Sequence, residues 1–121
     1  MKKSLKVLLV SASLGLAACG TKYPPPDSQM NMATSEIGQA ESIGAYESAP
    51  LELKSARDKL EQAKQAVQRE DNLAAKRLAE QAIVDANLAQ AKARTAKSQK
   101  TVEELKASIQ TLQDELNRTA R

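Results

Sequence analysis

The sequence contains no histidine, phenylalanine or tryptophan, and aromatic residues make up 2% of its 121 positions. Large aromatic side chains usually supply much of the buried area of a compact core, so we expect helices packed on helices rather than a globule with a deep cleft. The single cysteine, Cys19, excludes a disulfide within the chain. Without imidazole or a second thiol, Ser-His and Cys-His nucleophile pairs and most transition-metal sites are excluded as well.

Carboxylate pairs are present, but their spacing does not suit acid–base catalysis. Glu103-Glu104 and Asp114-Glu115 are neighbours in sequence, and adjacent residues on a helix do not face each other. Catalysis also needs a shielded pocket, which thin helices do not enclose, and the sequence has no glycine-rich phosphate loop. We therefore expect no enzyme and no metal site.

The formal net charge of +3 comes from one end of the chain. Lys2, Lys3 and Lys6 lie in the first 18 residues, which contain no acid, and the remaining residues carry equal numbers of basic and acidic side chains. A balanced chain without aromatic stacking residues gives no support to nucleic-acid binding. We expect no nucleic-acid partner.

Residues 1–18 have the parts of a bacterial export signal. The lysines form a positively charged start, and the apolar stretch that follows is much shorter than the roughly 20 residues of a membrane-spanning helix. We predict a lipoprotein signal peptide over residues 1–18 and a covalent lipid on the Cys19 thiol, with an ordinary secretory signal and a leftover cysteine as the disfavoured alternative. The end of the stretch closely resembles a lipobox, and its signal-peptidase motif is Leu16, Ala17 and Ala18.

The acylated cysteine and its neighbour predict the location of the protein. Each buried methylene contributes about 0.8 kcal/mol, so two or more acyl chains anchor a protein stably. In the Gram-negative lipoproteins that this segment resembles, an aspartate directly after the cysteine is the usual signal for retention in the inner membrane, and Gly20 stands there instead. We expect the periplasmic face of the outer membrane, with the inner membrane less favoured, and no cofactor apart from the lipid.

Two segments with weaker structural signals follow Cys19. Residues 19–33 are predicted to be a flexible linker, because Pro24-Pro25-Pro26 favours extended polyproline II. Residues 34–47 are predicted to form a short helix, capped by Thr34 or Ser35. Its apolar residues recur at steps of three, at Ile37, Ala40 and Ile43.

Residues 49–119 carry the strong helical signal. Pro50 suits a first helical position, and Glu70-Asp71-Asn72 interrupts good helix formers, with Asp71 as the expected cap of a second helix. The sequence predicts an all-α antiparallel αα-hairpin, and one unbroken helix remains the alternative. The first helix carries an apolar stripe at Leu53, Ala56, Leu60, Ala63 and Val67. The second carries a ridge of small residues at Ala75, Ala79, Ala82, Ala86, Ala89, Ala93 and Ala96.

Beyond residue 96 the second helix is predicted to extend into a coiled-coil-like C-terminal segment. Its length exceeds that of the first helix, so its apolar residues have nothing in the chain to cover them unless residues 34–47 fold back that far. We expect another helix there, from a second copy or from a different protein; a frayed tail is the alternative. The residues of this partner seam are Val102, Leu105, Ile109, Leu112 and Leu116.

A run of cations precedes the seam. A contact with anionic lipopolysaccharide or with the carboxylates of wall peptides is one interpretation, and a solvated helix face is the favoured one. The run comprises Lys92, Arg94, Lys97 and Lys100, with no acid between them.

Four short runs stand out, residues 46–53 (YESAPLEL), 56–60 (ARDKL), 78–82 (LAEQA) and 85–89 (DANLA). Together they resemble a family of Gram-negative envelope lipoproteins that is defined by an alanine-rich helical domain of unknown function. The likeness covers about residues 30–105 and implies a lipid anchor, a linker and a helical domain with no catalytic motif. Some members carry an additional peptidoglycan-binding domain like that of outer membrane protein A, which this sequence lacks. The chain departs from the family at Glu70, where a glycine often marks the turn.

Three functions fit these features. The first is an outer-membrane-tethered periplasmic adaptor that docks a helical partner through Leu105, Ile109 and Leu112. The second is a self-associating structural lipoprotein that resembles the Braun type, although this chain ends in Ala120-Arg121 rather than the lysine that links that protein to peptidoglycan. The third, a chaperone, would need a broader apolar surface than an alanine ridge offers. We rank the adaptor first.

Overall fold

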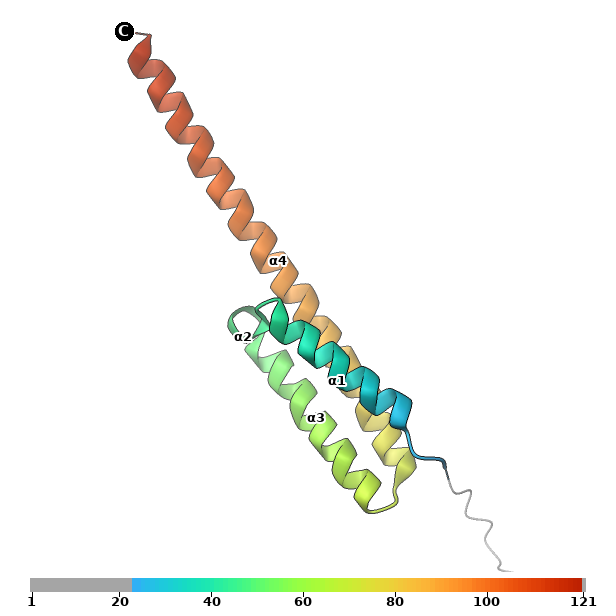
Figure 1. Ribbon diagram of the computed structural model, residues 1–121. Coiled ribbons are helices and arrows are strands. Elements are labelled where there is room, and N and C mark those ends of the chain that lie inside the picture. Colours follow the sequence, from blue (N-terminus) through green and yellow to red (C-terminus); the bar gives the residue numbers. More distant parts are fainter. Residues whose placement is uncertain (1–22, 121) are drawn as a thin grey trace, which may run out of the picture.

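The computed structural model describes residues 23–120, which form four helices and no strand. They are α1 (Asp27–Ser42), α2 (Ala45–Ser48), α3 (Pro50–Gln68) and α4 (Asn72–Thr119). Helices α1, α3 and the first half of α4 pack side by side as a bundle, and the second half of α4 continues beyond it (Figure 1). The all-α fold with a long last helix is confirmed.

Helices α3 and α4 form the predicted antiparallel hairpin, so the alternative of one unbroken helix is wrong. The turn follows a Schellman pattern, in which Asp71 N donates to Ala66 O and Glu70 N donates to Val67 O, each at 2.9 Å. Glu70 takes the left-handed conformation with φ 59°, at the position that favours glycine. The side chain of Asp71 caps α4 as predicted, because its Oδ1 accepts from Ala74 N at 3.0 Å.

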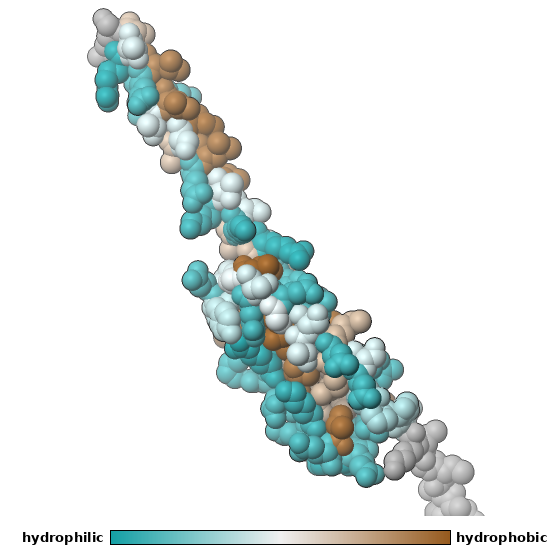
Figure 2. Space-filling model, in the orientation of Figure 1, coloured by the Kyte–Doolittle hydropathy of each residue, from teal (hydrophilic) through white to brown (hydrophobic). Residues whose placement is uncertain are grey.

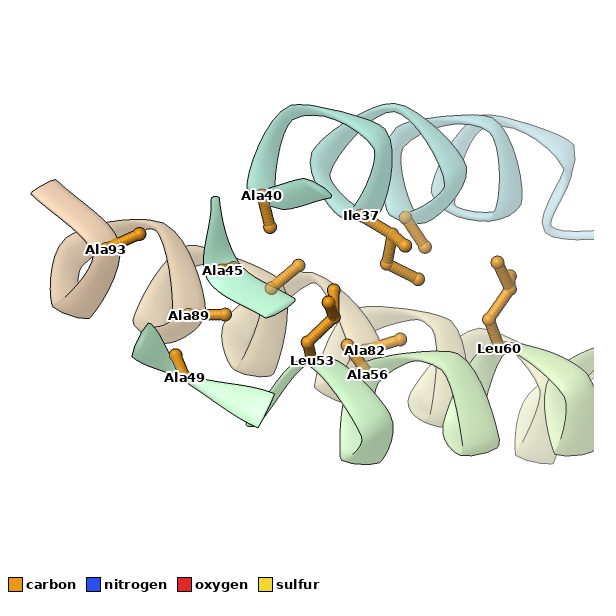
Figure 3. Packing of buried hydrophobic residues seen from close by; sticks show 12 residues of the cluster. Ile37, Ala40, Ala45, Ala49, Leu53, Ala56, Leu60, Ala82, Ala89 and Ala93 are labelled. Atoms are coloured by element: carbon orange, nitrogen blue, oxygen red, sulfur yellow. The ribbon is translucent and has the colours of Figure 1, made fainter. Parts of the chain in front are cut away.

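The core of the bundle consists mostly of alanine. Small side chains let helices approach closely and lose no rotamer entropy when buried, and Leu53 is the largest fully buried side chain. Figure 3 shows Ile37 of α1 and Leu60 of α3 pointing into the space between the helices. The buried residues of α3 and α4 are Leu53, Ala56, Leu60, Ala63, Ala66, Ala75, Ala79, Ala82, Ala86, Ala89, Gln90 and Ala93.

The predicted stripe and ridge are confirmed with two local differences. On α3, Ala66 is fully buried while Val67 is only half-buried, because the helix ends there and turns away. On α4, Ala96 is half-buried, since it lies where the bundle ends.

The linker predicted over residues 19–33 is too long, because α1 begins at Asp27. Pro24 and Pro25 precede the helix, but Pro26 lies at the N-cap, where a proline leaves the hydrogen bonds of the helix intact. The proline run therefore marks the start of a helix as well as a spacer. Residues 19–22 lie outside the described part of the chain.

The short helix predicted over residues 34–47 is also wrong in its bounds. It is the second half of α1, followed by a break and by the separate helix α2. Gly44 makes the break in the left-handed conformation with φ 88°, which a residue with a Cβ adopts only with strain. Helix α1 buries Ala33, Ile37 and Ala40 against the hairpin, so the bundle has three long helices rather than two.

Candidate functional site

The second half of α4 extends away from the bundle as a single helix (Figure 1). We call residues 97–119 the overhang; all of them are exposed, whereas Ala93 is the last buried residue of α4. At 1.5 Å per residue the overhang is about 35 Å long. Neither α1 nor α2 folds back along it. The uncovered extension predicted from the sequence is therefore present as a helix up to Thr119.

The seam residues share one face of the overhang, and Figure 2 shows hydrophobic side chains gathered along one side of this segment. They alternate in steps of three and four residues, which keeps them on one side of a helix. A soluble chain seldom leaves a row of large apolar side chains in water unless the row serves an interaction. Their exposed fractions are 48% for Val102, 60% for Leu105, 46% for Ile109, 59% for Leu112 and 70% for Leu116.

The polar side chains of the overhang interact within the helix itself. Lys106 Nζ lies 3.0 Å from Glu103 Oε1, and Gln110 Nε2 lies 3.5 Å from Asp114 Oδ1. Such exposed pairs at steps of three or four contribute only about 0.2–0.5 kcal/mol each to a helix. They support the helix without covering the apolar seam.

The cation run divides between the bundle and the overhang. Lys92 forms an ion pair with Glu52 of α3, and this hydrogen bond holds the pKa of the Glu52 carboxyl below its ordinary value. Arg94 Nη2 donates to Gln90 Oε1 at 3.3 Å. These two side chains are thus used by the protein's own fold, which favours the interpretation of the run as a solvated helix face.

Gln90 is a buried polar residue that sequence reasoning missed. It is 6% exposed, and its Nε2 donates to two acceptors of Glu36 on α1, the backbone O at 3.0 Å and Oε2 at 2.7 Å. Burying an amide is costly unless its donors are paired. Gln90 therefore fixes the position of α1 on α4. A polar residue directly after ridge residue Ala89 was the only sequence signal for it.

A second polar contact joins α3 to α4. Asp85 Oδ2 accepts from Ser55 Oγ at 2.6 Å and from Lys59 Nζ at 2.5 Å. Burial alone would raise the pKa of Asp85, but the two hydrogen bonds and the lysine charge together outweigh it and hold this pKa below its ordinary value. The contact sets the register of the hairpin close to its middle.

The start of the described chain is held at the turn end of the bundle. Asn72 Nδ2 donates to Tyr23 O at 2.7 Å, and Pro26 is buried. Counting 1.5 Å per residue from Asn72, the seam begins about 45 Å and ends about 66 Å further along α4. Tyr23, where the described chain begins, and the seam therefore lie at opposite ends of the described part of the chain (Figure 1). Cys19 itself and the motif Leu16, Ala17 and Ala18 lie outside the described residues.

Residues 23–120 were searched for a metal-binding cluster and for a helix that could span a membrane. No group of three or more acidic side chains comes close enough together in this range to hold a metal ion. None of the helices in the same range combines the length and the apolar composition that crossing a bilayer requires.

In a comparison with known protein families, one family model matches most of the described chain. The model of the DUF4398 family, a domain of unknown function, matches residues 28–105. The crystal structure of a DUF4398 family protein from Pseudomonas aeruginosa PAO1 is similar with a TM-score of 0.75 and 38% sequence identity, over 79% of this chain and 99% of that chain. A comparison with curated protein sequences found no match.

Proposed function

This chain belongs to the DUF4398 family, and from that premise we propose that it is a non-enzymatic helical adaptor of the cell envelope, held by a lipid on Cys19 at the periplasmic face of the outer membrane. In this role the bundle is a rigid base and the overhang of α4 presents the seam to another helix.

The exposed seam is the observation that carries the proposal. Five large apolar side chains lie in one row on a helix that no other described helix covers. Burying such a side chain contributes about 1.5–3 kcal/mol, so a partner helix along the seam would gain several such contributions. A row of this spacing fits another helix better than it fits an extended peptide or a small molecule.

A catalytic role receives no support from the described residues. The acids with lowered pKa values, Glu52 and Asp85, are each explained by an ion pair that joins α3 to α4. The adjacent carboxylates of the overhang are exposed on a single helix, where no shielded pocket can form around them. A binding role therefore accounts for more of the surface than an enzymatic one.

The anchor rests on the lipobox of residues 16–19. With Tyr23 held at the turn end of the bundle, few residues separate Cys19 from the folded domain. Acyl chains at that place would hold the turn end at the membrane surface. We assign no nucleic-acid partner and no bound cofactor other than this lipid.

The second candidate is a self-associating structural lipoprotein, in which the seam pairs with another copy of the same chain. The length and apolar character of the seam suit both candidates. They differ in the identity of the molecule that contacts Ile109.

Photo-crosslinking in the living bacterium tests the proposal. A photoreactive residue at Ile109 of the full chain should yield a crosslinked product, whereas the same residue at Ala107, on the opposite side of the overhang, should yield none. A product whose mass is not a multiple of the chain supports the adaptor, and products at multiples support self-association. Equal yields at both positions, or no product at either, would refute docking through the seam.

A further inference from the structure

Opposite its alanine ridge, α4 carries a second row of residues that extends the seam back into the bundle. Between Val84 and Thr95, each member of the row follows a buried ridge alanine by two positions, which is about 200° around the helix. The row therefore faces away from α1 and α3, and all of its members are exposed. We call it the outer stripe: Val84, Leu88, Ala91, Thr95, Ser98, Val102, Leu105, Ile109, Leu112 and Leu116.

We propose that the outer stripe binds a second copy of the same chain, with the two α4 helices antiparallel and related by a two-fold axis near Lys100. This inference rests on the second candidate function, self-association through the seam, because it names the helix that docks there. It goes further in that the contact includes residues of the bundle as well as those of the overhang.

The sizes of the side chains favour this pairing. With the axis near Lys100, stripe residues at equal distances from residue 100 lie level with each other, so small members meet large ones. Every layer then contains at least one branched apolar side chain. The layers pair Ser98 with Val102, Thr95 with Leu105, Ala91 with Ile109, Leu88 with Leu112 and Val84 with Leu116 of the second copy, and the two-fold axis repeats each pairing.

A parallel pair would use the same stripe less well. Ala91, Thr95 and Ser98 would then each meet their own copies, which leaves three successive layers without a large apolar side chain. The surface has a shallow depression at this small part of the stripe, where Leu105 and Val102 of an antiparallel second copy would lie. Its lining residues are Arg94, Thr95, Ser98, Gln99, Val102 and Glu103.

The proposed dimer has a defined shape. Because the axis lies 28 positions beyond Asn72, the two turn ends are separated by about 84 Å along the paired helices. Each turn end holds Tyr23, which lies four positions after Cys19 in the sequence. Two lipid anchors at opposite ends would hold such a rod along the membrane surface.

Disulfide mapping in the native envelope tests the register. The full chain is produced in two tagged forms in the same cell, one with Leu88→Cys and the other with Leu112→Cys, and mild oxidant is added. The antiparallel pair predicts a disulfide between the two forms, and neither variant expressed alone should dimerise. Within one chain the two positions are about 36 Å apart, far beyond the 4.4–6.8 Å between Cα atoms that a disulfide spans.

The controls are a cysteine on the opposite face of the helix and the helical content of the variants. Leu88→Cys combined with Ala107→Cys, on the wrong face, should give no disulfide, and both exposed substitutions should leave the helical content unchanged. Disulfides from each variant alone would show a parallel pair and overturn the proposal. No disulfide in any combination would also overturn it, while a crosslink from Ile109 to another protein would leave the proposed function standing. If neither a disulfide nor a crosslink from Ile109 formed, the proposed function would be refuted as well.

Discussion

The side-chain amide of Gln90 on α4 donates hydrogen bonds to both the backbone oxygen and the carboxylate of Glu36 on α1, across 54 positions of the chain. Around this contact the interface is built from alanines and a few aliphatic residues. Alanine packing is close but offers little shape to fix the position of one helix along another. The amide supplies that positional information, because only one register pairs both of its donors.

Replacement of Gln90 should therefore loosen α1. We expect Gln90→Ala to lower the free energy of unfolding by about 1–2 kcal/mol, through lost hydrogen bonds and a small cavity. Thermal or denaturant unfolding of the full chain measures this change. The matched control is Gln62→Ala, an exposed glutamine on α3, whose effect should stay within about 0.5 kcal/mol. Equal effects at the two positions would contradict the role assigned to Gln90.

The left-handed conformation of Glu70 in the turn between α3 and α4 can be tested by comparing two substitutions. Glu70 has φ 59°, and this conformation is unfavourable for a residue with a Cβ. Glu70→Gly should be more stable than Glu70→Ala by about 1 kcal/mol. The comparison between the two variants isolates the backbone effect, because both remove the same side chain. Unfolding curves that place the alanine variant level with the glycine variant would show that the turn is not strained.

The Asp85 contact predicts a dependence of stability on pH. The pKa of Asp85 in the folded protein lies below the ordinary value of an aspartate, so the unfolded chain binds a proton more readily than the folded one. The stabilisation is thus present above about pH 4 and is lost as the pH falls through the folded pKa. Asp85→Asn should cost about 1 kcal/mol at neutral pH, and its difference from the parent should shrink in acid.

The matched control for Asp85 is Asp58, whose ion pair with Lys54 stays within α3 and is exposed. Exposed pairs of this kind contribute little, so Asp58→Asn should change the free energy of unfolding by a few tenths of a kcal/mol at most. An Asp85 variant that loses as little stability as this control would contradict a structural role for the contact.

If a lipid on Cys19 anchors the chain, substitutions at Cys19 and Gly20 should change where the protein is found in the cell. Cys19→Ala removes the thiol that carries the lipid, and the chain should then leave the membrane fraction or remain uncleaved. Fractionation of the envelope and the mass of the mature protein measure both effects. Gly20→Asp keeps the thiol and, by the resemblance to Gram-negative lipoproteins, should move the chain to the inner membrane. Membrane association that persists without Cys19 would contradict the lipid anchor.

The hairpin could be predicted from the sequence because the small and apolar residues of its two helices recur at regular steps. The alanine ridge of α4 and the apolar stripe of α3 each recur at steps of three and four, which a helix converts directly into one face. Asp71 was identified as a cap because its side chain competes with the backbone for hydrogen bonds. These features depend on local chemistry, which a single sequence contains.

The remaining features depend on contacts between distant segments. The start of α1 was missed because a proline run suits both a spacer and the residue before a helix. Gln90 was missed because the burial of one amide depends on where α1 lies, and no local pattern encodes that. The seam was predicted from Val102 onward, but its continuation to Leu88 and Val84 was not recognised until the structure showed which face of α4 the bundle leaves uncovered.

Under the proposed function, another helix covers the seam in the cell envelope. The most direct measurement compares the rates at which a thiol reagent modifies Ile109→Cys and Ala107→Cys in the membrane-anchored full chain. Both positions are exposed on the isolated molecule, so the covered seam predicts that Cys at 109 reacts several-fold more slowly than Cys at 107, and that the difference disappears after denaturation. Equal rates before denaturation would show that the seam stands in water and would contradict the account.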